Sequence, residues 1–163
     1  PGSTIGNYKP KEAKILLKNF SKILGLNNFL IVGVDLKKDI DVIERAYNDS
    51  EGITASFNKN IVNVVNEKCG SLIDSKDFDH KAFFNENESR IEMHLVSKKK
   101  QVINILDSKI HIDQGESIHT ESSYKYSVKS FKDLLESQKF EIIKVLTDEK
   151  SFFGIFFLKV KNT

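Results

Sequence analysis

A carboxylate and a hydroxyl stand two residues apart in the stretch GESIHTESSYKY, residues 115–126. Its apolar and aromatic residues alternate with polar ones, which is the pattern of a β-strand. Because successive side chains of a strand point to opposite faces, Glu121 and Ser123 share a face, about 7 Å apart along the strand. Such a pair can hold a small ligand that offers both a hydrogen-bond donor and an acceptor. From this stretch alone, a solvated strand face without a ligand is the favoured explanation.

The composition is that of an ordinary globular domain. The chain has 163 residues, 39% hydrophobic and 29% charged, which suits one hydrophobic core. Its net charge of +2 argues against a nucleic-acid partner, and a hairpin turn accounts for the basic run at 98–100. The single cysteine, Cys69, excludes a disulfide framework and fits a reducing, cytoplasmic setting. No apolar run approaches the roughly 18 residues of a membrane span, so no membrane partner is expected.

The order of the expected elements indicates an α/β fold that carries an antiparallel insertion. A helix beginning at Pro10 leads into the apolar run 29–35, which is typical of a strand buried on both faces of a parallel sheet. Asp35 would end that strand at the sheet edge where ligands bind. The remaining expectations are helices after Asp39 and over 53–69, a short helix around 78–84, strands at 90–97, 101–106 and 109–112, a helix after Ser127, and a hairpin of 140–147 and 152–160.

Two of the expected helices present apolar faces at helical spacing. The helix after Asp39 aligns Ile43 with Tyr47, one turn apart. The next helix is expected to bury one face in the core, formed by Ile53, Phe57, Ile61, Val64 and Val65.

The motifs of several self-contained catalytic sites are absent. No two of the eight glycines have G-x-G spacing, which excludes a dinucleotide-type glycine loop and a P-loop. Neither a nucleophile-elbow motif nor an HExxH motif occurs. The histidines are scattered along the chain without metal-ligand spacing, so no metal site is predicted from His80, His94, His111 and His119.

Six stretches together resemble the histidine-specific, S-adenosylmethionine-dependent methyltransferases of ergothioneine biosynthesis. They occur in the family's order and with similar spacing: PGSTIGN (1–7), GVDLKKD (33–39), AYND (46–49), GITASFNKN (52–60), FNENESRIEMHLVSKKKQ (84–101) and GESIHTESSYKY (115–126). The resemblance implies the fold class, the C-terminal half of a Rossmann-like class I methyltransferase core with an antiparallel α+β substrate-domain insertion. Residues 1–48 and 127–163 would belong to the core and residues 49–126 to the insertion.

The resemblance also implies what this chain lacks. PGSTIGN is similar to a motif in the middle of the family's core, so the first residues are expected to be native and not the remnant of a tag. The family binds S-adenosylmethionine through the other half, so no cofactor-binding residue is expected here, and the chain alone is expected to be inactive. Half a sheet would leave an apolar edge, which would pair with a second copy or with an N-terminal half.

The resemblance implies a site for the head group of a small amino-acid substrate. Asn7 would hold the head group through its amide, which can both donate and accept. Gly2 would allow close approach of the backbone there. Tyr47 would reach the substrate carboxylate with its hydroxyl.

The same resemblance implies the recognition of the substrate side chain. Phe57 and Met93 would form apolar walls, while Glu121 and Ser123 would hydrogen-bond the two nitrogens of an imidazole ring. Phe84 stands where the family pattern has tryptophan.

The implied reaction is methylation of the α-amino group of histidine, ending in a trimethylated betaine. It needs positioning of the amine more than a protein nucleophile, so no catalytic residue is assigned. Two alternatives stay open: a non-catalytic small-ligand-binding or interaction module derived from this fold, and a methyltransferase for another amino acid such as tryptophan.

Overall fold

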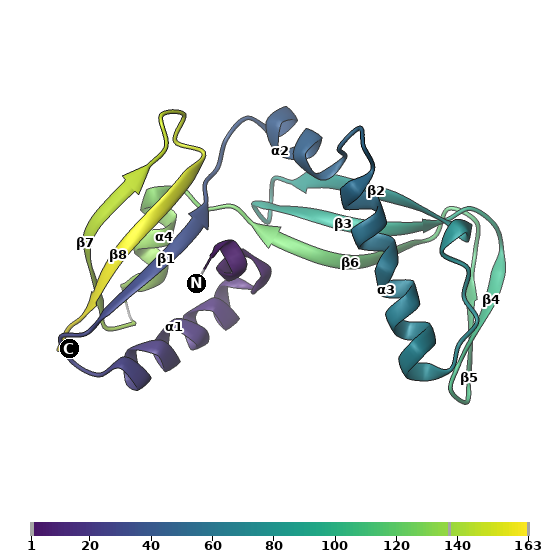
Figure 1. Ribbon diagram of the computed structural model, residues 1–163, viewed down its shortest axis with the longest axis horizontal. Helices are drawn as coiled ribbons and strands as arrows, with labels where there is room; N and C mark the ends of the chain where they lie inside the picture. The colour runs from purple at the N-terminus through teal and green to yellow at the C-terminus, as the bar shows by residue number, and fades with distance from the viewer. Residues whose placement is uncertain (1, 137, 163) are drawn as a thin grey trace. The chain divides into compact units, whose positions relative to one another are not determined.

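The computed structural model describes residues 2–136 and 138–162, and the chain divides into two units (Figure 1). Unit 1 comprises Pro1–Asp39, Glu86–Arg90 and Ser122–Thr163, and unit 2 comprises Ile40–Asn85 and Ile91–Glu121. The chain thus leaves unit 1 twice and returns twice. Among the described helices, none has the length and apolar character needed to cross a lipid bilayer.

Unit 1 is built on a three-stranded antiparallel sheet in the order β1-β8-β7. Its elements are the 3₁₀ helix η1 (Ser3–Asn7), α1 (Pro10–Leu24), β1 (Phe29–Asp35), α4 (Val128–Leu135), β7 (Phe140–Thr147) and β8 (Phe153–Val160). Pro10 opens α1 at a position where the missing N–H costs nothing, and Gly25 ends the helix with a positive φ of 73°.

One face of this sheet forms the core of unit 1. Val32 and Val34 of β1 and Phe156 of β8 pack with Leu17 of α1 and Phe131 of α4 in a single hydrophobic cluster. Alternation along the strands sends every second side chain to this face. The two helices therefore cover the same side of the sheet.

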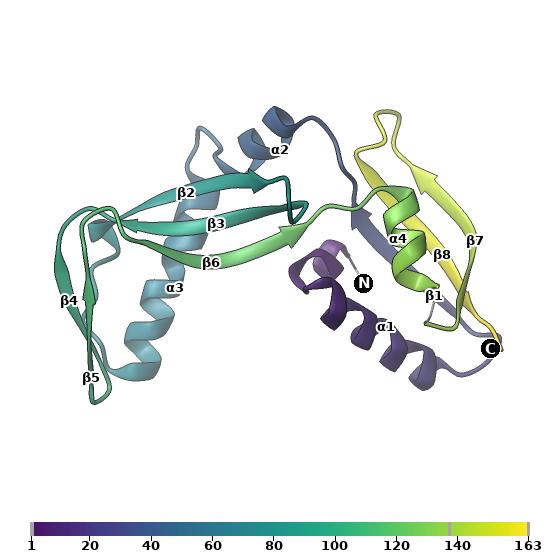
Figure 2. The same ribbon diagram turned by 180° about the vertical axis from the view of Figure 1, so that it is seen from behind.

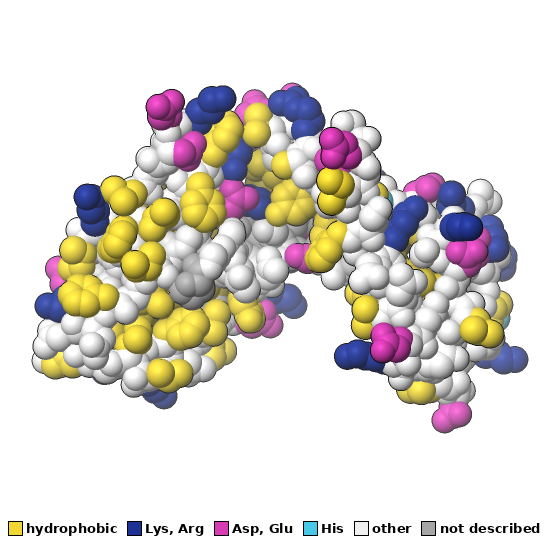
Figure 3. All heavy atoms as spheres, viewed as in Figure 1, with side chains coloured by type: hydrophobic (Ala, Val, Ile, Leu, Met, Phe, Trp, Pro, Cys, Tyr) yellow, Lys and Arg dark blue, Asp and Glu magenta, His cyan; other side chains and the backbone are white. Residues whose placement is uncertain are grey.

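The other face of the sheet corrects one expectation. Strand β1 was expected to be buried on both faces of a parallel sheet, but it pairs antiparallel with β8 and alternates between buried and exposed at its start. Phe29 and Ile31 are 62% and 52% exposed. Hydrophobic side chains gather over this unit in the space-filling view (Figure 3). A continuous apolar run in the sequence shows that both faces of a strand are apolar. It does not show whether both faces are covered in the fold.

Unit 2 combines two helices with antiparallel strands. Its elements are α2 (Ile40–Tyr47), α3 (Ile53–Cys69), the 3₁₀ helix η2 (Ser75–Asp77), β2 (Phe78–Asn85), β3 (Arg90–Ser97), β4 (Gln101–Ile105), β5 (Ser108–Ile112) and β6 (Ser117–Tyr124). The ends of β3 and β6 continue into unit 1 at Arg90 and after Glu121. The strands form a sheet of order β2-β3-β6 and a separate β4-β5 hairpin. Helix α2, expected with the methyltransferase core, lies in unit 2, where Ile43 packs with Ala82 and Ile91.

Two expectations for the elements of unit 2 are wrong. Residues 78–84 form strand β2 and not a short helix, because Phe78 and Ala82 are buried at even spacing on one face. Helix α3 faces the sheet with the side opposite to the one expected. Its buried residues are Asn58 and Val62, whereas Ile53, Phe57, Ile61 and Val64 are exposed.

The basic run forms the turn between β3 and β4, but these strands belong to different sheets, so the turn does not close the expected hairpin. Each lysine lies opposite an aspartate, in the pairs Lys98–Asp79 at 3.6 Å, Lys99–Asp77 at 2.8 Å and Lys100–Asp113 at 3.4 Å. Exposed charges that are paired in this way indicate a solvated turn and not a binding site for a polyanion.

Candidate functional site

The seven residues implied as an acceptor site are distributed over both units. Unit 1 carries Gly2, Asn7 and Ser123, and unit 2 carries Tyr47, Phe57, Met93 and Glu121. Each group is described within its own unit.

Ser123 is held by a buried lysine in unit 1. The side chain of Lys125 is 1% exposed, and its Nζ lies 2.6 Å from Asp35 Oδ2 and 3.0 Å from Ser123 Oγ. The other oxygen of Asp35 accepts from Lys38 Nζ at 2.6 Å. Burying an ammonium group is costly unless it is paired and hydrogen-bonded, and Asp35 supplies the pairing.

The contact with Lys125 fixes the hydrogen-bonding role of Ser123. An ammonium group can only donate, so Ser123 Oγ is the acceptor in this bond. The hydroxyl proton of Ser123 then points elsewhere and is available for donation to a further partner. Asp35, expected at a ligand-binding strand end, instead serves as the counter-ion of this arrangement.

A glycine that the sequence reasoning did not single out lies beside Ser123. A Cβ on Gly6 would come within 2.9 Å of the carbonyl oxygen of Tyr124 and 3.3 Å of Ser123 Oγ. Only glycine therefore lets η1 pack this closely against the end of β6. Its position inside the motif STIGN was the feature of the sequence that could have identified it. Gly2 and Asn7 at the two ends of η1 are exposed, and a Cβ on Gly2 would meet nothing within 4 Å.

Tyr47 and Met93 come together in unit 2. Met93 is 3% exposed and belongs to a cluster with Ile43, Ala82 and Ile91, against which the half-buried ring of Tyr47 packs. Phe84, the residue at the tryptophan position, packs against the same cluster. Phe57 lies apart from it on the exposed side of α3, with 63% of its surface accessible.

The neighbour of Phe57 is the polar centre of unit 2. Asn58 is buried, and its amide nitrogen donates to the backbone carbonyl of His94 and to His80 Nδ1, both at 3.0 Å. Because His80 Nδ1 accepts, Nε2 carries the proton and donates to the carbonyl of Tyr47 at 2.8 Å. This chain of bonds fixes the end of α2 on which Tyr47 lies.

Asn58 also reaches the strand that carries Glu121. The hydroxyl of Thr120 lies 2.6 Å from Asn58 Oδ1 and 2.9 Å from the carbonyl oxygen of Met93. Glu121 follows on the opposite face of β6 and is half-buried. The sequence reasoning missed Asn58, although a polar residue between the apolar positions of α3 was a sign that the other side faces the sheet.

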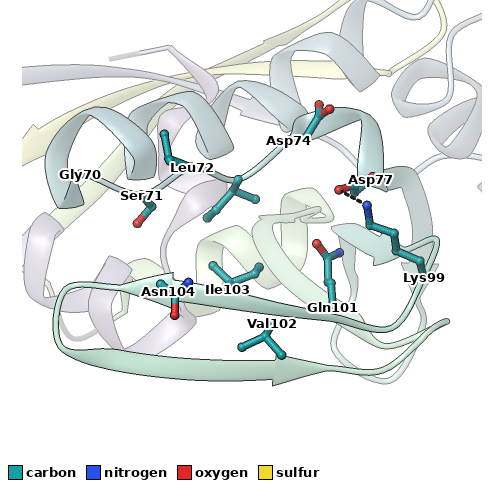
Figure 4. Close-up of a pocket in the computed structure, with 11 residues that line it drawn as sticks. Gly70, Ser71, Leu72, Asp74, Asp77, Lys99, Gln101, Val102, Ile103 and Asn104 are labelled. Carbon is teal, nitrogen blue, oxygen red and sulfur yellow. Dashed lines mark ion pairs between the residues drawn. The ribbon is translucent and has the colours of Figure 1, made fainter.

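A separate pocket lies at the far end of α3 in unit 2 (Figure 4). Its volume is ≈ 340 Å³, and its walls come from Gly70, Ser71, Leu72, Ile73, Asp74, Asp77, Lys99 and the β4 residues Gln101, Val102, Ile103 and Asn104. The ion pair of Asp77 and Lys99 closes one end. None of the seven expected acceptor residues lines this pocket.

The residues of this chain do not fit S-adenosylmethionine. Its eight glycines form no glycine-rich loop, and the carboxylate of Asp35, which ends β1, is engaged by Lys38 and Lys125.

Comparison with known proteins agrees with the motifs. The model of the family described as "Histidine-specific methyltransferase, SAM-dependent" matches residues 1–160. A histidine N-alpha-methyltransferase of Mycobacterium tuberculosis is 35% identical over 156 residues, which are 94% of this chain and 49% of that protein. The protein of the same name from Mycolicibacterium smegmatis is 38% identical over 127 residues, or 77% of this chain and 40% of that protein.

Two further matches are more distant. Ergothioneine biosynthesis protein 1 of Schizosaccharomyces pombe is 26% identical over 87% of this chain and 18% of that protein. A solved S-adenosylmethionine-dependent methyltransferase from Clostridium acetobutylicum aligns with a TM-score of 0.49 at 9% identity, covering 98% of this chain and 56% of that chain. This chain spans about half the length of the curated histidine methyltransferases that it matches. Because the family model matches residues 1–160, the chain belongs to the histidine-specific, S-adenosylmethionine-dependent methyltransferases.

Proposed function

We propose that this chain is the part of a methyltransferase that recognises the acceptor, and that the acceptor is histidine, methylated on its α-amino group. The match of the family model to residues 1–160 carries the proposal. The chain's own task in this reaction is to bind the amino acid and to hold its amine in a fixed position, because orientation lowers the barrier without a protein nucleophile.

The imidazole ring is the feature that distinguishes histidine from other amino acids. A neutral imidazole has one N–H donor and one acceptor nitrogen. The carboxylate of Glu121 accepts from the N–H, and the hydroxyl of Ser123 donates to the other nitrogen. The buried bond from Lys125 to Ser123 Oγ supports this assignment, because it leaves Ser123 as a donor.

Polar contacts of this kind give strong discrimination. A site built to hydrogen-bond its substrate can reject an analogue without those groups by roughly 10⁴-fold, because its own polar atoms would lose their partners. Tryptophan, which has a ring N–H but no acceptor nitrogen, would leave the Ser123 hydroxyl without a partner.

The remaining residues serve the head group and the walls of the site. Asn7 and Tyr47 bind the amino-acid head group and carboxylate, with Gly2 leaving room for the ligand next to the backbone. Met93 and Phe57 supply apolar surface. The exposed ring of Phe57 and the half-buried ring of Tyr47 support these roles, because both retain accessible surface.

The methyl donor is bound by protein outside this chain. The exposed apolar face of the unit 1 sheet, which includes Phe29 and Ile31, supports this step, because soluble proteins usually cover such a surface with another layer. We propose that a donor-binding half of the family's core covers that face and pairs with the edge strand β1.

Binding of L-histidine to the complete protein tests the acceptor assignment. In calorimetric titration, Glu121→Gln should weaken histidine binding by about 10- to 100-fold, the worth of a hydrogen bond to a charged group. Glu141→Gln, at an exposed position of β7, is the matched control and should leave the affinity unchanged. Equal histidine affinity of the Glu121→Gln and Glu141→Gln variants would show that Glu121 does not read the imidazole.

A further inference from the structure

A row of three stacked rings crosses the sheet of unit 2. The ring of His94 on the central strand β3 stacks on Phe83 of β2 at 5.1 Å and on His119 of β6 at 4.7 Å between centroids. In Figure 2 this sheet is seen in front of α3. The buried Met93 packs on the opposite face, so the stacked rings lie on the side of the sheet away from the hydrophobic cluster.

A carboxylate lies close to the two histidines of this row. Glu92 and His94 share a face of β3, and Glu92 Oε2 lies 3.1 Å from His94 Nε2. One potential metal-ligating atom from each of Glu92, His94 and His119 lies within 4.8 Å of the other two. Two imidazoles and a carboxylate are a ligand set that Zn²⁺ binds in proteins, with a fourth position left for water.

The proton positions favour His119 as a ligand. Its Nε2 lies 3.0 Å from the backbone carbonyl oxygen of Glu121, which can only accept. Nε2 therefore carries the proton, and in the neutral ring the lone pair is on Nδ1. Metal-bound histidines are usually held by such a bond from the second ring nitrogen.

His94 can adopt the same arrangement with the roles of its two ring nitrogens exchanged. Its Nδ1 lies 2.7 Å from the hydroxyl of Ser117, which can accept the ring proton. The lone pair on Nε2 can then face the carboxylate of Glu92, whereas in the other tautomer Nε2 donates its proton to Glu92 at 3.1 Å. A metal ion bound at this position would replace that proton.

Burial also suits a metal site. Glu92 is buried, and its second oxygen accepts from the amide of Asn85 at 3.0 Å, which holds the carboxylate in place. His94 is half-buried and His119 is exposed, so an ion can enter from solvent on the His119 side. Zinc ligands lie about 2.0–2.2 Å from the ion, so the three ligating atoms, now within 4.8 Å of one another, would draw closer together on binding.

We propose that Glu92, His94 and His119 form a Zn²⁺ site that links β3 to β6 within unit 2. The proposal does not depend on the acceptor or the reaction proposed above. Because the ion binds the folded sheet and not the unfolded chain, it stabilises the protein in proportion to its occupancy.

Calorimetric titration of the full, untagged chain with Zn²⁺ tests the proposal, together with thermal unfolding in Zn²⁺ and in chelator. We expect one equivalent of Zn²⁺ to bind and to raise the unfolding temperature. His119→Asn should weaken binding at least tenfold and abolish the shift while leaving the unfolding temperature in chelator unchanged, because its side chain is exposed. The matched control is His111→Asn, an exposed histidine of β5, which should bind Zn²⁺ like the original chain.

Two outcomes would overturn the site. One is the absence of Zn²⁺ binding, or binding that His119→Asn leaves unchanged. The other comes from Co²⁺ as a spectroscopic substitute: a thiolate charge-transfer band that Cys69→Ser removes would place the ion on the cysteine. Glu92→Gln is a second variant, and circular dichroism checks that its fold is retained.

Discussion

At the scale of single residues, Ser123 owes its role to a neighbour that no motif identified. Glu121 and Ser123 could be paired from strand alternation alone, because two residues of spacing determine the face. The engagement of the Ser123 oxygen could not be predicted, because it depends on Lys125, whose ammonium is held by Asp35 from a strand 90 positions away. Buried polar networks of this kind join residues that are distant in sequence.

Ser123→Ala tests this role directly. The variant should fold, because Lys125 keeps its ion pair with Asp35, and the lost hydrogen bond should lower the free energy of unfolding by about 1–3 kcal/mol. Histidine affinity of the complete protein should fall about tenfold. Urea denaturation and histidine titration measure the two effects, with Ser122→Ala as the control on the other face of the strand. Unchanged histidine affinity would remove Ser123 from the site.

Tyr126 carries a buried hydroxyl group without a hydrogen bond to the described residues. It is buried, its oxygen has no hydrogen-bond partner among the described residues, and burial, followed by the neighbouring Tyr124, raises its pKa to about 12. Tyr126→Phe should therefore be neutral or stabilise the protein by up to about 1 kcal/mol in urea denaturation. A clear loss of stability would mean that the hydroxyl has a partner.

At the scale of elements, the strands were easier to predict than the face of α3. Strand β3 shows its alternation openly, with Ile91, Met93 and Leu95 all buried. Helix α3 carries apolar residues on one side and Asn58 with Val62 on the other, and the sheet takes the second side because Asn58 bonds three of its neighbours. Sequence periodicity identifies the more hydrophobic face of a helix. It does not show that a hydrogen-bond network can bury the more polar face instead.

The start of α3 gives the fold a dependence on pH. The carboxylate of Asp49 accepts from the backbone N–H groups of Ile53 and Thr54, both at 2.8 Å. Its pKa is lowered to about 2, first by the side-chain hydrogen bond of Thr54 and then by these backbone bonds. A depressed folded-state pKa means that the carboxylate stabilises the fold above its unfolded-state pKa and loses this effect as the pH falls toward 2.

Asp49→Asn isolates that effect. Asparagine can still accept a backbone bond but does not titrate, so the variant should be less stable than the original chain at pH 7 and should lose less stability between about pH 4 and pH 2. Thermal unfolding followed by circular dichroism at stepped pH measures both. Parallel pH profiles of the two proteins would contradict the assignment.

At the scale of the whole molecule, sequence reasoning identified the family but not the arrangement of its parts. The six motifs were visible because they lie in short continuous stretches, and the family match over residues 1–160 confirms them. The two histidines near Glu92 were not visible as a pair, because cross-strand register brings them together. The exposed apolar face of unit 1 was foreseen as an edge, whereas the structure exposes both an edge strand and a sheet face.

Transfer of a methyl group from S-adenosylmethionine to L-histidine is the most direct test of the central claim. The chain is combined with a separately produced donor-binding half, and the mass of the product is measured by mass spectrometry. We predict histidine that carries one or more added methyl groups from the mixture, none from the chain alone, and far less product when tryptophan replaces histidine. A well-folded complex of the two halves that leaves histidine unmethylated, or that methylates tryptophan in preference, would contradict the account.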